Sequence, residues 1–358
     1  MTILVPVKRG NSRGEKKVLS GGIERFTDLI YENNKDISLC EIFIDDREAG
    51  NSSHIIEKEI ISKKADILLL NELNHFYVNV IKYNIPTIFI VHEGLTRSLS
   101  ILRLSEVIKI AEKQNAHIYF VSRNQYNYLK NNIKRVSNYE MSVNSVKGFV
   151  APAFCDNFSF YEKRDNNIIT VGRNGPDKDP FYIHKKCSNI DYDSLVLTNV
   201  PTYKTPYNAN YVKKNTHWSG KQQTVYSLPH NQILDRIARS KVYVSTCTME
   251  SWGITALEAL GSGVPLLIVT DNTGVHSSEE IAADKSHYIK IKKNCSDLEF
   301  KEAVDYLSDF STEKRREIYD MTNEKHSFEN WKKNIQAMIE LRKIDKNTNQ
   351  NDLMKFLE

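Results

Sequence analysis

The chain has 358 residues, 40% of them hydrophobic, and exceeds the roughly 250–300 residues that one core supports, so we expect two domains. Its 49 Lys and Arg nearly balance 45 Asp and Glu, and a net charge of +4 excludes a protein that binds nucleic acid with its whole surface. The five cysteines are odd in number, scattered and without metal-ligand spacing, so we expect reduced thiols. No apolar stretch approaches a signal peptide or a membrane span, and we expect a cytoplasmic protein.

Short strands rich in Val, Ile and Leu alternate with amphipathic helices in the first half of the chain. The expected strands are 2–7, 38–44, 65–71, 86–92 and 116–122, and the expected helices are 22–33, 53–63, 100–114 and 123–133. This alternation is typical of a parallel sheet that helices cover on both faces. The sequence therefore predicts an α/β domain over residues 1–160.

The same pattern restarts after a polar, aromatic connector at 154–167. The expected strands are 167–173, 193–199, 241–246, 264–270 and 288–292, and the expected helices are 229–239, 252–261 and 298–308. They predict a second α/β domain over 161–326, then a helix at 327–345 that packs back toward the first domain and a frayed tail at 346–358. Two doubly wound sheets in tandem predict a ligand cleft at the carboxyl ends of their strands.

Two glutamates, Glu250 and Glu258, flank the segment Ser-Trp-Gly-Ile-Thr-Ala-Leu. Glu250 precedes the expected helix, at the end that attracts anions, and Glu258 lies about 12 Å further along the helix at a rise of ~1.5 Å per residue. Carboxylates this far apart cannot share a proton. They can hold the two ends of an elongated ligand, such as the sugar and the ribose of a sugar nucleotide.

The segment "ESWGITALEALGSGVPLLIVTD" resembles the E-x7-E region of retaining GT-B glycosyltransferases. Three other segments resemble the same family: "SGGIERF" (20–26), "VGRNGPDKDP" (171–180) and "LPHNQILDRIARSKVYVSTCTMESWG" (228–253). The resemblance implies an α/β GT-B fold, in which two Rossmann-like domains face a central cleft. It also implies an enzyme that transfers sugar from a nucleotide-sugar with retention of anomeric configuration.

The resemblance assigns roles to individual residues. It implies that Glu258 binds the donor ribose, that Glu250 contacts the transferred sugar, and that Arg173 and Lys178 bind the diphosphate, although 173–178 also reads as a surface turn. His92, at the end of a strand, is expected beside the sugar and acceptor or is structural. The remaining expected donor-binding residues are Gly21, Gly22, Ser251, Trp252, Gly253 and Ile254, and weaker candidates are Gly274, His276, Glu279 and Glu280.

A metal ion is not expected. The Asp-x-Asp pattern at 191–193 matches a divalent-ion motif of another glycosyltransferase fold, but its context favours a surface turn. Arg173 and Lys178 already supply the positive charge that a metal would bring, so we expect neither metal nor other cofactor. The leaving phosphate is the expected base.

Basic residues near aromatic ones suggest an acceptor with a phosphate backbone. They cluster at 8–17, 123–135 and 211–218, a composition that suits a nucleic acid and an everted base, or simply a solvated surface. The expected acceptor or DNA contacts are Arg9, Arg13, Lys16, Lys17, Glu93, Lys213 and Lys214.

The segment "VHEGLTRSLSILRLSE" (91–106) resembles the T-even phage α-glucosyltransferases that modify hydroxymethylcytosine in DNA. This resemblance implies a UDP-sugar donor, carrying glucose or a pentose such as arabinose, and 5-hydroxymethylcytosine in double-stranded phage DNA as acceptor. Three alternatives stay open: a bacterial-type enzyme for a glycan, lipid or metabolite, a GT-B-fold nucleotide-sugar epimerase, and a non-catalytic DNA-binding or assembly subunit. We expect a monomer or weak dimer without a membrane partner.

Overall fold

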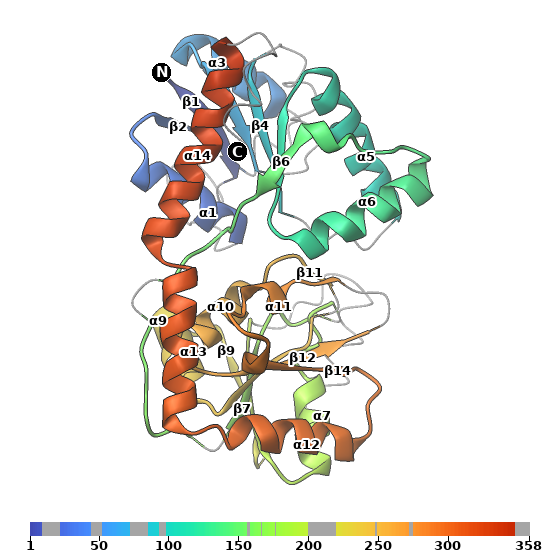
Figure 1. Cartoon of the computed structure of the whole chain (residues 1–358), viewed down its shortest axis with the longest axis vertical. Helices are drawn as coiled ribbons and strands as arrows, with labels where there is room; N and C mark the ends of the chain where they lie inside the picture. The colour runs from blue at the N-terminus through green and yellow to red at the C-terminus, as the bar shows by residue number, and fades with distance from the viewer. Residues whose placement is uncertain are drawn as a thin grey trace. The chain divides into compact units, whose positions relative to one another are not determined.

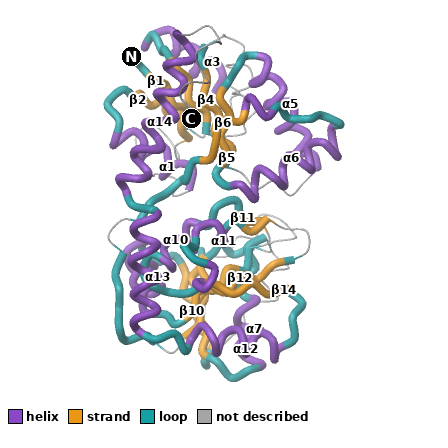
Figure 2. The backbone as a smooth tube through the Cα atoms, viewed as in Figure 1, coloured by secondary structure: helices purple, strands orange, loops and turns teal. Residues whose placement is uncertain are grey.

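A computed structural model describes residues 1–8, 22–43, 52–71, 85–92, 98–155, 158–165, 167–175, 177–199, 220–247, 249–271 and 275–347. The chain divides into two compact units, Met1–Ala153 with Glu329–Glu358 and Phe154–Phe328. Within each unit, helices flank a parallel sheet (Figures 1 and 2). No helix among the described residues is long and apolar enough to cross a membrane.

The first unit contains a six-stranded sheet in the order β2-β1-β3-β4-β5-β6. Its central strands β3, β4 and β5 are buried along their whole length, as expected for strands covered on both faces. Its elements are β1 (Ile3–Lys8), α1 (Gly22–Asn33), β2 (Ile37–Ile42), α3 (Ser52–Lys63), β3 (Ile67–Leu70), β4 (Thr87–Val91), α5 (Ser98–Lys113), β5 (His117–Phe120), α6 (Arg123–Ser137), η1 (Val143–Ser145), β6 (Val146–Phe149) and α14 (Phe328–Asn347).

Helix α14 brings the C-terminal part of the chain onto the first unit. The indole N–H of Trp331 donates to the carbonyl of Ala151 at 3.1 Å, and its ring meets Phe26 of α1 edge-on at 6.4 Å. Ile335 and Ile339, one and two turns further along, are buried. These contacts form one apolar stripe on α14, which holds the helix to this unit.

The second unit also contains a six-stranded parallel sheet, in the order β14-β12-β10-β7-β8-β9. From the central strand β7 the chain runs outward through β8 and β9, then crosses back to β10 and continues outward on the other side. Its elements are β7 (Asn167–Val171), α7 (Tyr182–Asn189), β8 (Asp193–Thr198), β9 (Gln222–Tyr226), α9 (His230–Arg239), β10 (Val242–Ser245), β11 (Met249–Glu250), α10 (Ile254–Leu260), β12 (Leu266–Thr270), β13 (Val275–His276), α11 (Ser278–Ile281), η2 (Lys285–His287), β14 (Tyr288–Lys292), α12 (Asp297–Ser308) and α13 (Thr312–Lys325).

The chain divides at Ala153, earlier than the boundary at residue 160 that the sequence suggests. The connector belongs to the second unit because Phe158 and Phe160 pack against two glycines. A Cβ on Gly261 would lie 2.4 Å from the Phe158 ring, and one on Gly263 would lie 2.8 Å from the Phe160 ring. The two glycines therefore provide the space in which the connector lies.

Four buried histidines make the stability of the fold dependent on pH. Burial lowers the pKa of His92 to about 3 and the pKa of His184, His276 and His326 to about 4, from 6.5. Between these pH values the unfolded chain binds more protons than the folded chain, so the free energy of unfolding falls as the pH falls. We expect Tm to be highest above pH 6.5 and to decrease steadily toward pH 4. A thermal-melt series in which Tm stays level or rises on acidification would contradict these assignments.

Candidate functional site

The order of the strands in the second unit marks where a ligand binds. Strands β8 and β9 lie on one side of β7, and β10, β12 and β14 lie on the other, so the strand order reverses between β7 and β10. Open α/β sheets bind ligands beyond the carboxyl ends of the strands at such a switch point. The segment 172–181 follows β7, and the segment 246–253 follows β10. These two segments carry Arg173, Lys178 and Glu250, so the sequence candidates lie at the expected edge of the sheet.

Lys178 and Glu250 form an ion pair at this edge. The Lys178 Nζ lies 2.8 Å from a Glu250 carboxylate oxygen, and only 24% of the lysine side chain and 17% of the glutamate side chain are exposed. The hydroxyl of Thr246 donates to the Lys178 carbonyl at 2.6 Å and fixes the loop. Burial by itself would lower the pKa of Lys178, but the charge and hydrogen bond of Glu250 outweigh it, so the pKa rises and the ammonium stays charged. A fixed, half-buried cation of this kind can bind a diphosphate and stabilise it as a leaving group.

The sequence suggested that Glu250 lies directly before a helix, but the structure places it in the short strand β11. Strand β11 pairs with β13, which sets Glu250 opposite His276, and the Ser277 N–H donates to the Glu250 carbonyl at 3.0 Å. His276 is 4% exposed, and burial lowers its pKa to about 4, so it is neutral at pH 7. The positive charge of Lys178 therefore balances Glu250 without a contribution from the histidine.

Gly253 lets the chain turn from β11 into α10. Its φ is +98°, and a Cβ at this position would lie 2.7 Å from the Ser278 Oγ and 3.3 Å from the Glu250 Cγ. A residue with a side chain would be strained here and would press on the glutamate of the ion pair. The expected contribution of Gly253 to the site is thus conformational.

We expect Gly253→Ala to destabilise the second unit by about 1–2 kcal/mol, the usual cost of a left-handed backbone for an L-residue, and to reduce activity by moving Glu250. The matched control is Gly220→Ala, since Gly220 has φ +69° but no heavy atom within 4 Å of an added Cβ. The Tm and the turnover rate of both variants measure the effect. Equal rates for the two variants would show that Gly253 does not hold Glu250 in place.

Glu258 lies inside the second unit, on α10. It is 3% exposed, and one carboxylate oxygen lies 3.4 Å from the Nε2 of His230, which begins α9. The side chain of His230 is 46% exposed, so this imidazole lies beside the carboxylate on the solvent side. Helix α10 has only seven residues, which leaves little helix dipole for the anion site that the sequence suggested. Charged side chains, rather than a helix dipole, are therefore what this part of the second unit offers to a ligand.

Arg173 and the Asp-x-Asp pattern form surface ion pairs. The Arg173 guanidinium lies 2.7 Å from Asp177, with 72% of its side chain exposed, so it does not join the pair of Lys178 and Glu250. Asp191 pairs with Lys221 at 2.9 Å and has φ +61°, as in a turn before β8. Among the residues that the structure describes, no three or more His, Cys, Asp or Glu side chains are grouped to hold a metal ion.

His92 and Trp252 are buried among aromatic rings. His92, in the first unit, is 9% exposed and its ring centroid lies 4.9 Å from that of Phe26. Trp252, in the second unit, is 9% exposed and meets His326 edge-on at 5.8 Å. Of the other expected donor residues, Ser251 lies between β11 and the turn at Gly253, and Gly22 and Ile254 are the first residues of α1 and α10.

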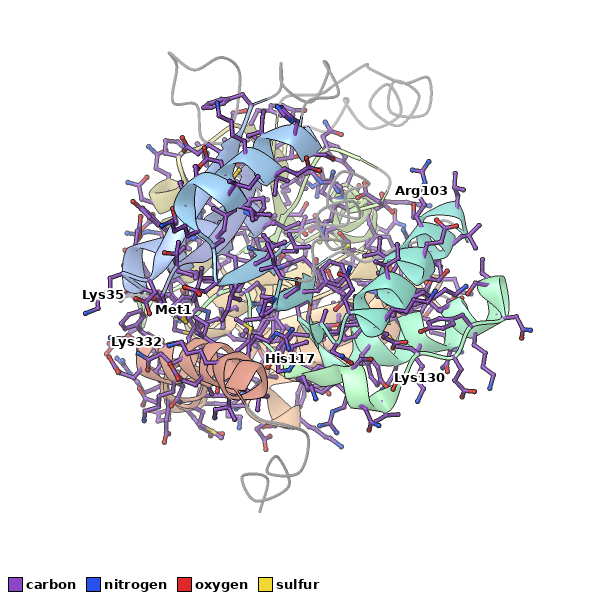
Figure 3. The ribbon with its side chains drawn as sticks, turned by 90° about the horizontal axis from the view of Figure 1, so that it is seen from above. Met1, Lys35, Arg103, His117, Lys130 and Lys332 are labelled. Carbon is purple, nitrogen blue, oxygen red and sulfur yellow. The ribbon has the colours of Figure 1, made fainter. Side chains whose placement is uncertain are left out.

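All seven expected acceptor residues lie outside the described part of the chain. The residues that lie outside the described part of the chain are Arg9, Arg13, Lys16, Lys17, Gly21, Glu93, Lys213, Lys214 and Gly274. On α6, the Arg123 guanidinium covers the Phe149 ring at 5.6 Å and the Lys130 ammonium lies 5.7 Å from the Tyr126 ring centroid. Lys130 of α6 and Arg103 of α5 extend outward from the ribbon (Figure 3). Helix α6 therefore presents cations supported by aromatic rings.

Three residues of the site were missed by the sequence analysis. His230 lies beside Glu258, Thr246 bonds the Lys178 loop, and Tyr243 bonds Thr255 of α10. His230 follows a proline at the start of a helix, a position that could have drawn attention to it. Nothing in an apolar strand distinguishes Tyr243 from an ordinary core aromatic.

Known proteins share this fold. The pattern of the family Glycosyl transferases group 1 matches residues 156–325. Sucrose-phosphate synthase (tll1590) from Thermosynechococcus elongatus is 10% identical with a TM-score of 0.71, and the match covers 97% of this chain and 100% of that chain. Anabaena Alr3699/HepE in complex with UDP-glucose is 10% identical with a TM-score of 0.70, covering 95% of this chain and 99% of that chain. A chain of the GtfA/B complex is 14% identical with a TM-score of 0.60, and the match covers 82% of this chain but only 61% of that chain.

No curated protein matches the sequence. At such low identity the solved structures show the fold alone, and the family match covers the residues that form the pair of Lys178 and Glu250. The chain therefore has the two-domain α/β fold of GT-B proteins, and the match of its residues 156–325 to the glycosyl transferases group 1 family supports a glycosyltransferase enzyme.

Proposed function

We propose that the protein transfers a sugar from a UDP-sugar to a hydroxyl acceptor with retention of anomeric configuration. The observation that carries the proposal is the half-buried ion pair of Lys178 and Glu250 at the switch point of the second sheet, with Glu258 on the adjoining helix. The Anabaena protein of the same fold was crystallised with UDP-glucose, which supports a uridine nucleotide as the donor. Glucose and a pentose such as arabinose are the proposed sugars.

In the proposed reaction, Lys178 and Arg173 bind the diphosphate, Glu258 binds the ribose and Glu250 binds the transferred sugar. The bond between the anomeric carbon and the diphosphate oxygen breaks, and its electron pair leaves with the UDP. The acceptor oxygen bonds to the anomeric carbon on the same face, and its proton passes to the departing phosphate oxygen. Because an ammonium has three N–H donors, Lys178 can keep its bond to Glu250 while it binds phosphate.

The proposal includes no metal ion. Lys178 is charged and half-buried, and Arg173 follows β7 in the same loop, so two cations are available where charge grows on the leaving group. Under this proposal, activity persists after dialysis against EDTA.

We propose 5-hydroxymethylcytosine in double-stranded DNA as the acceptor. Support comes from the basic segments of the sequence and from α6, where Arg123 and Lys130 lie over aromatic rings. A glycan, a lipid and a small metabolite are the competing acceptors.

Mass spectrometry tests donor and acceptor together. The protein is incubated with UDP- and GDP-sugars and with duplex DNA that carries either cytosine or 5-hydroxymethylcytosine, and the digested nucleosides are weighed. The proposal requires a sugar mass on the hydroxymethylated base only. Release of UDP with unmodified DNA would keep the donor and reject the DNA acceptor, whereas no turnover of any UDP-sugar would reject the donor as well.

A further inference from the structure

Tyr243 is a buried residue that joins the two segments of the donor site. It lies in β10, at the centre of the second sheet, and is 3% exposed. Its hydroxyl lies 2.7 Å from the Thr255 Oγ1 and donates to the Val171 carbonyl at 3.4 Å. The Thr255 hydroxyl can then donate to the tyrosine oxygen, so one phenol bridges two partners that are distant in sequence.

The two partners belong to the segments that carry the charged residues. Val171 is the last residue of β7, directly before the loop that leads to Lys178. Thr255 lies in the first turn of α10, between Glu250 and Glu258. The phenol thus connects the cation loop to the helix of the glutamates.

The surroundings of Tyr243 agree with this placement. Burial raises its pKa, and the charges of Glu250, Lys178 and Glu258 all act on the hydroxyl, so all three groups lie near it. Because the phenol remains neutral, it adds no charge to the site and acts only through its two hydrogen bonds.

We propose that Tyr243 is a positioning residue for sugar transfer. Its hydrogen bonds to Val171 and Thr255 hold the Lys178 loop and α10 in a fixed position relative to each other. The inference rests on the proposed donor site. The hydrogen bond from Thr246 to the Lys178 carbonyl holds the same loop at its other end. Loss of the Tyr243 bridge should therefore let the loop and α10 shift slightly while the loop stays bound to the sheet. Displacements of ~1 Å between catalytic groups cost up to about 100-fold in rate.

The bridge is tested with Tyr243→Phe, Thr255→Val, the double variant, and Thr255→Ser as a conservative replacement that keeps the hydroxyl. The matched control is Tyr192→Phe, which removes a phenol bonded to Asp305 just before β8, at the amino end of the sheet. The probes are UDP, for affinity by calorimetry, and UDP-glucose, for kcat by UDP release. Tm is measured for each variant.

We expect Tyr243→Phe and Thr255→Val each to lower kcat by about 10-fold or more while the Kd for UDP changes by less than about 3-fold, because each segment still binds its own part of the donor. The double variant should lose no more than either single variant, and Thr255→Ser should recover most of the rate. Tyr192→Phe should keep kcat despite a similar change in Tm. If Tyr243→Phe does not fold, Thr255→Val and Thr255→Ser test the same bond from the helix side.

The outcomes separate the inference from the proposed function. Wild-type activity together with an unchanged kcat in Tyr243→Phe or Thr255→Val, or additive losses in the double variant, would overturn the positioning role and leave the donor site standing. A wild-type protein that neither binds UDP nor releases it from UDP-glucose would overturn both.

Discussion

Replacing Lys178 with methionine should lower kcat for sugar transfer by about 10²- to 10³-fold, the usual cost of removing one preorganised donor from a developing negative charge. Methionine keeps most of the aliphatic stem and removes only the ammonium. The charge matters here because it is half-buried, where an electrostatic interaction is stronger than in water. Lys178→Arg keeps a cation and should retain more activity than Lys178→Met. Release of UDP from UDP-glucose at saturating donor measures both.

The matched control for Lys178→Met is Lys221→Met. Lys221 also pairs with a carboxylate, that of Asp191, but 52% of its side chain is exposed and it lies just before β9, at the amino end of the sheet. Exposed pairs of this kind contribute little to stability, so this variant should keep both kcat and Tm. Equal kcat values in Lys178→Met and the wild type would remove Lys178 from the catalytic site.

Loss of Lys178 should also lower the stability of the fold. A second variant separates this loss of stability from the loss of catalysis. Lys178→Met leaves the Glu250 carboxylate partly buried without its cation, and an uncompensated buried charge is destabilising. The double variant Lys178→Met, Glu250→Gln removes that charge and should recover Tm without recovering kcat. Recovery of kcat along with Tm would mean that the pair is structural only.

Glu258→Gln should weaken UDP binding by about 10- to 100-fold, because hydrogen bonds to a charged partner contribute about 1.5–3 kcal/mol. The glutamine keeps the size of the side chain, so the packing around this 3% exposed residue should remain unchanged. The loss should appear mainly in donor affinity, since the ribose contact is the same in the ground and transition states. Calorimetric titration with UDP measures it.

Glu302→Gln is the control for this change. Glu302 is exposed on α12, away from α10 in sequence, and its replacement should leave the affinity for UDP unchanged. An unchanged affinity in Glu258→Gln as well would show that Glu258 serves the packing of α10 rather than the donor.

The fold could be predicted from the sequence wherever strands are apolar and buried. Strands β3, β4, β10 and β12 follow runs of Val, Ile and Leu, and such runs identify parallel strands. Strand β9 was missed because "QQTVY" lies at the sheet edge and is half exposed. Helix α13 was missed because its 14 residues are mostly charged and its three buried residues, Arg315, Ile318 and Thr322, form a weak apolar stripe.

The proposed donor site could be predicted only in part. Glu250, Glu258 and Lys178 stand in a recognisable motif, and the structure places Lys178 against Glu250. Their contacts with Thr246, His230 and Tyr243 could not be predicted, because they depend on the register of β10 against β7 and on the turn at Gly253. A tyrosine in a buried strand reveals its role only when the partners of its hydroxyl are known.

The most direct test of the donor site is a crystal structure of the wild-type protein with UDP. The account predicts diphosphate oxygens within hydrogen-bond distance of the Lys178 Nζ and ribose hydroxyls on the Glu258 carboxylate, beyond the carboxyl ends of β7 and β10. UDP bound elsewhere, with the pair of Lys178 and Glu250 untouched, would contradict it.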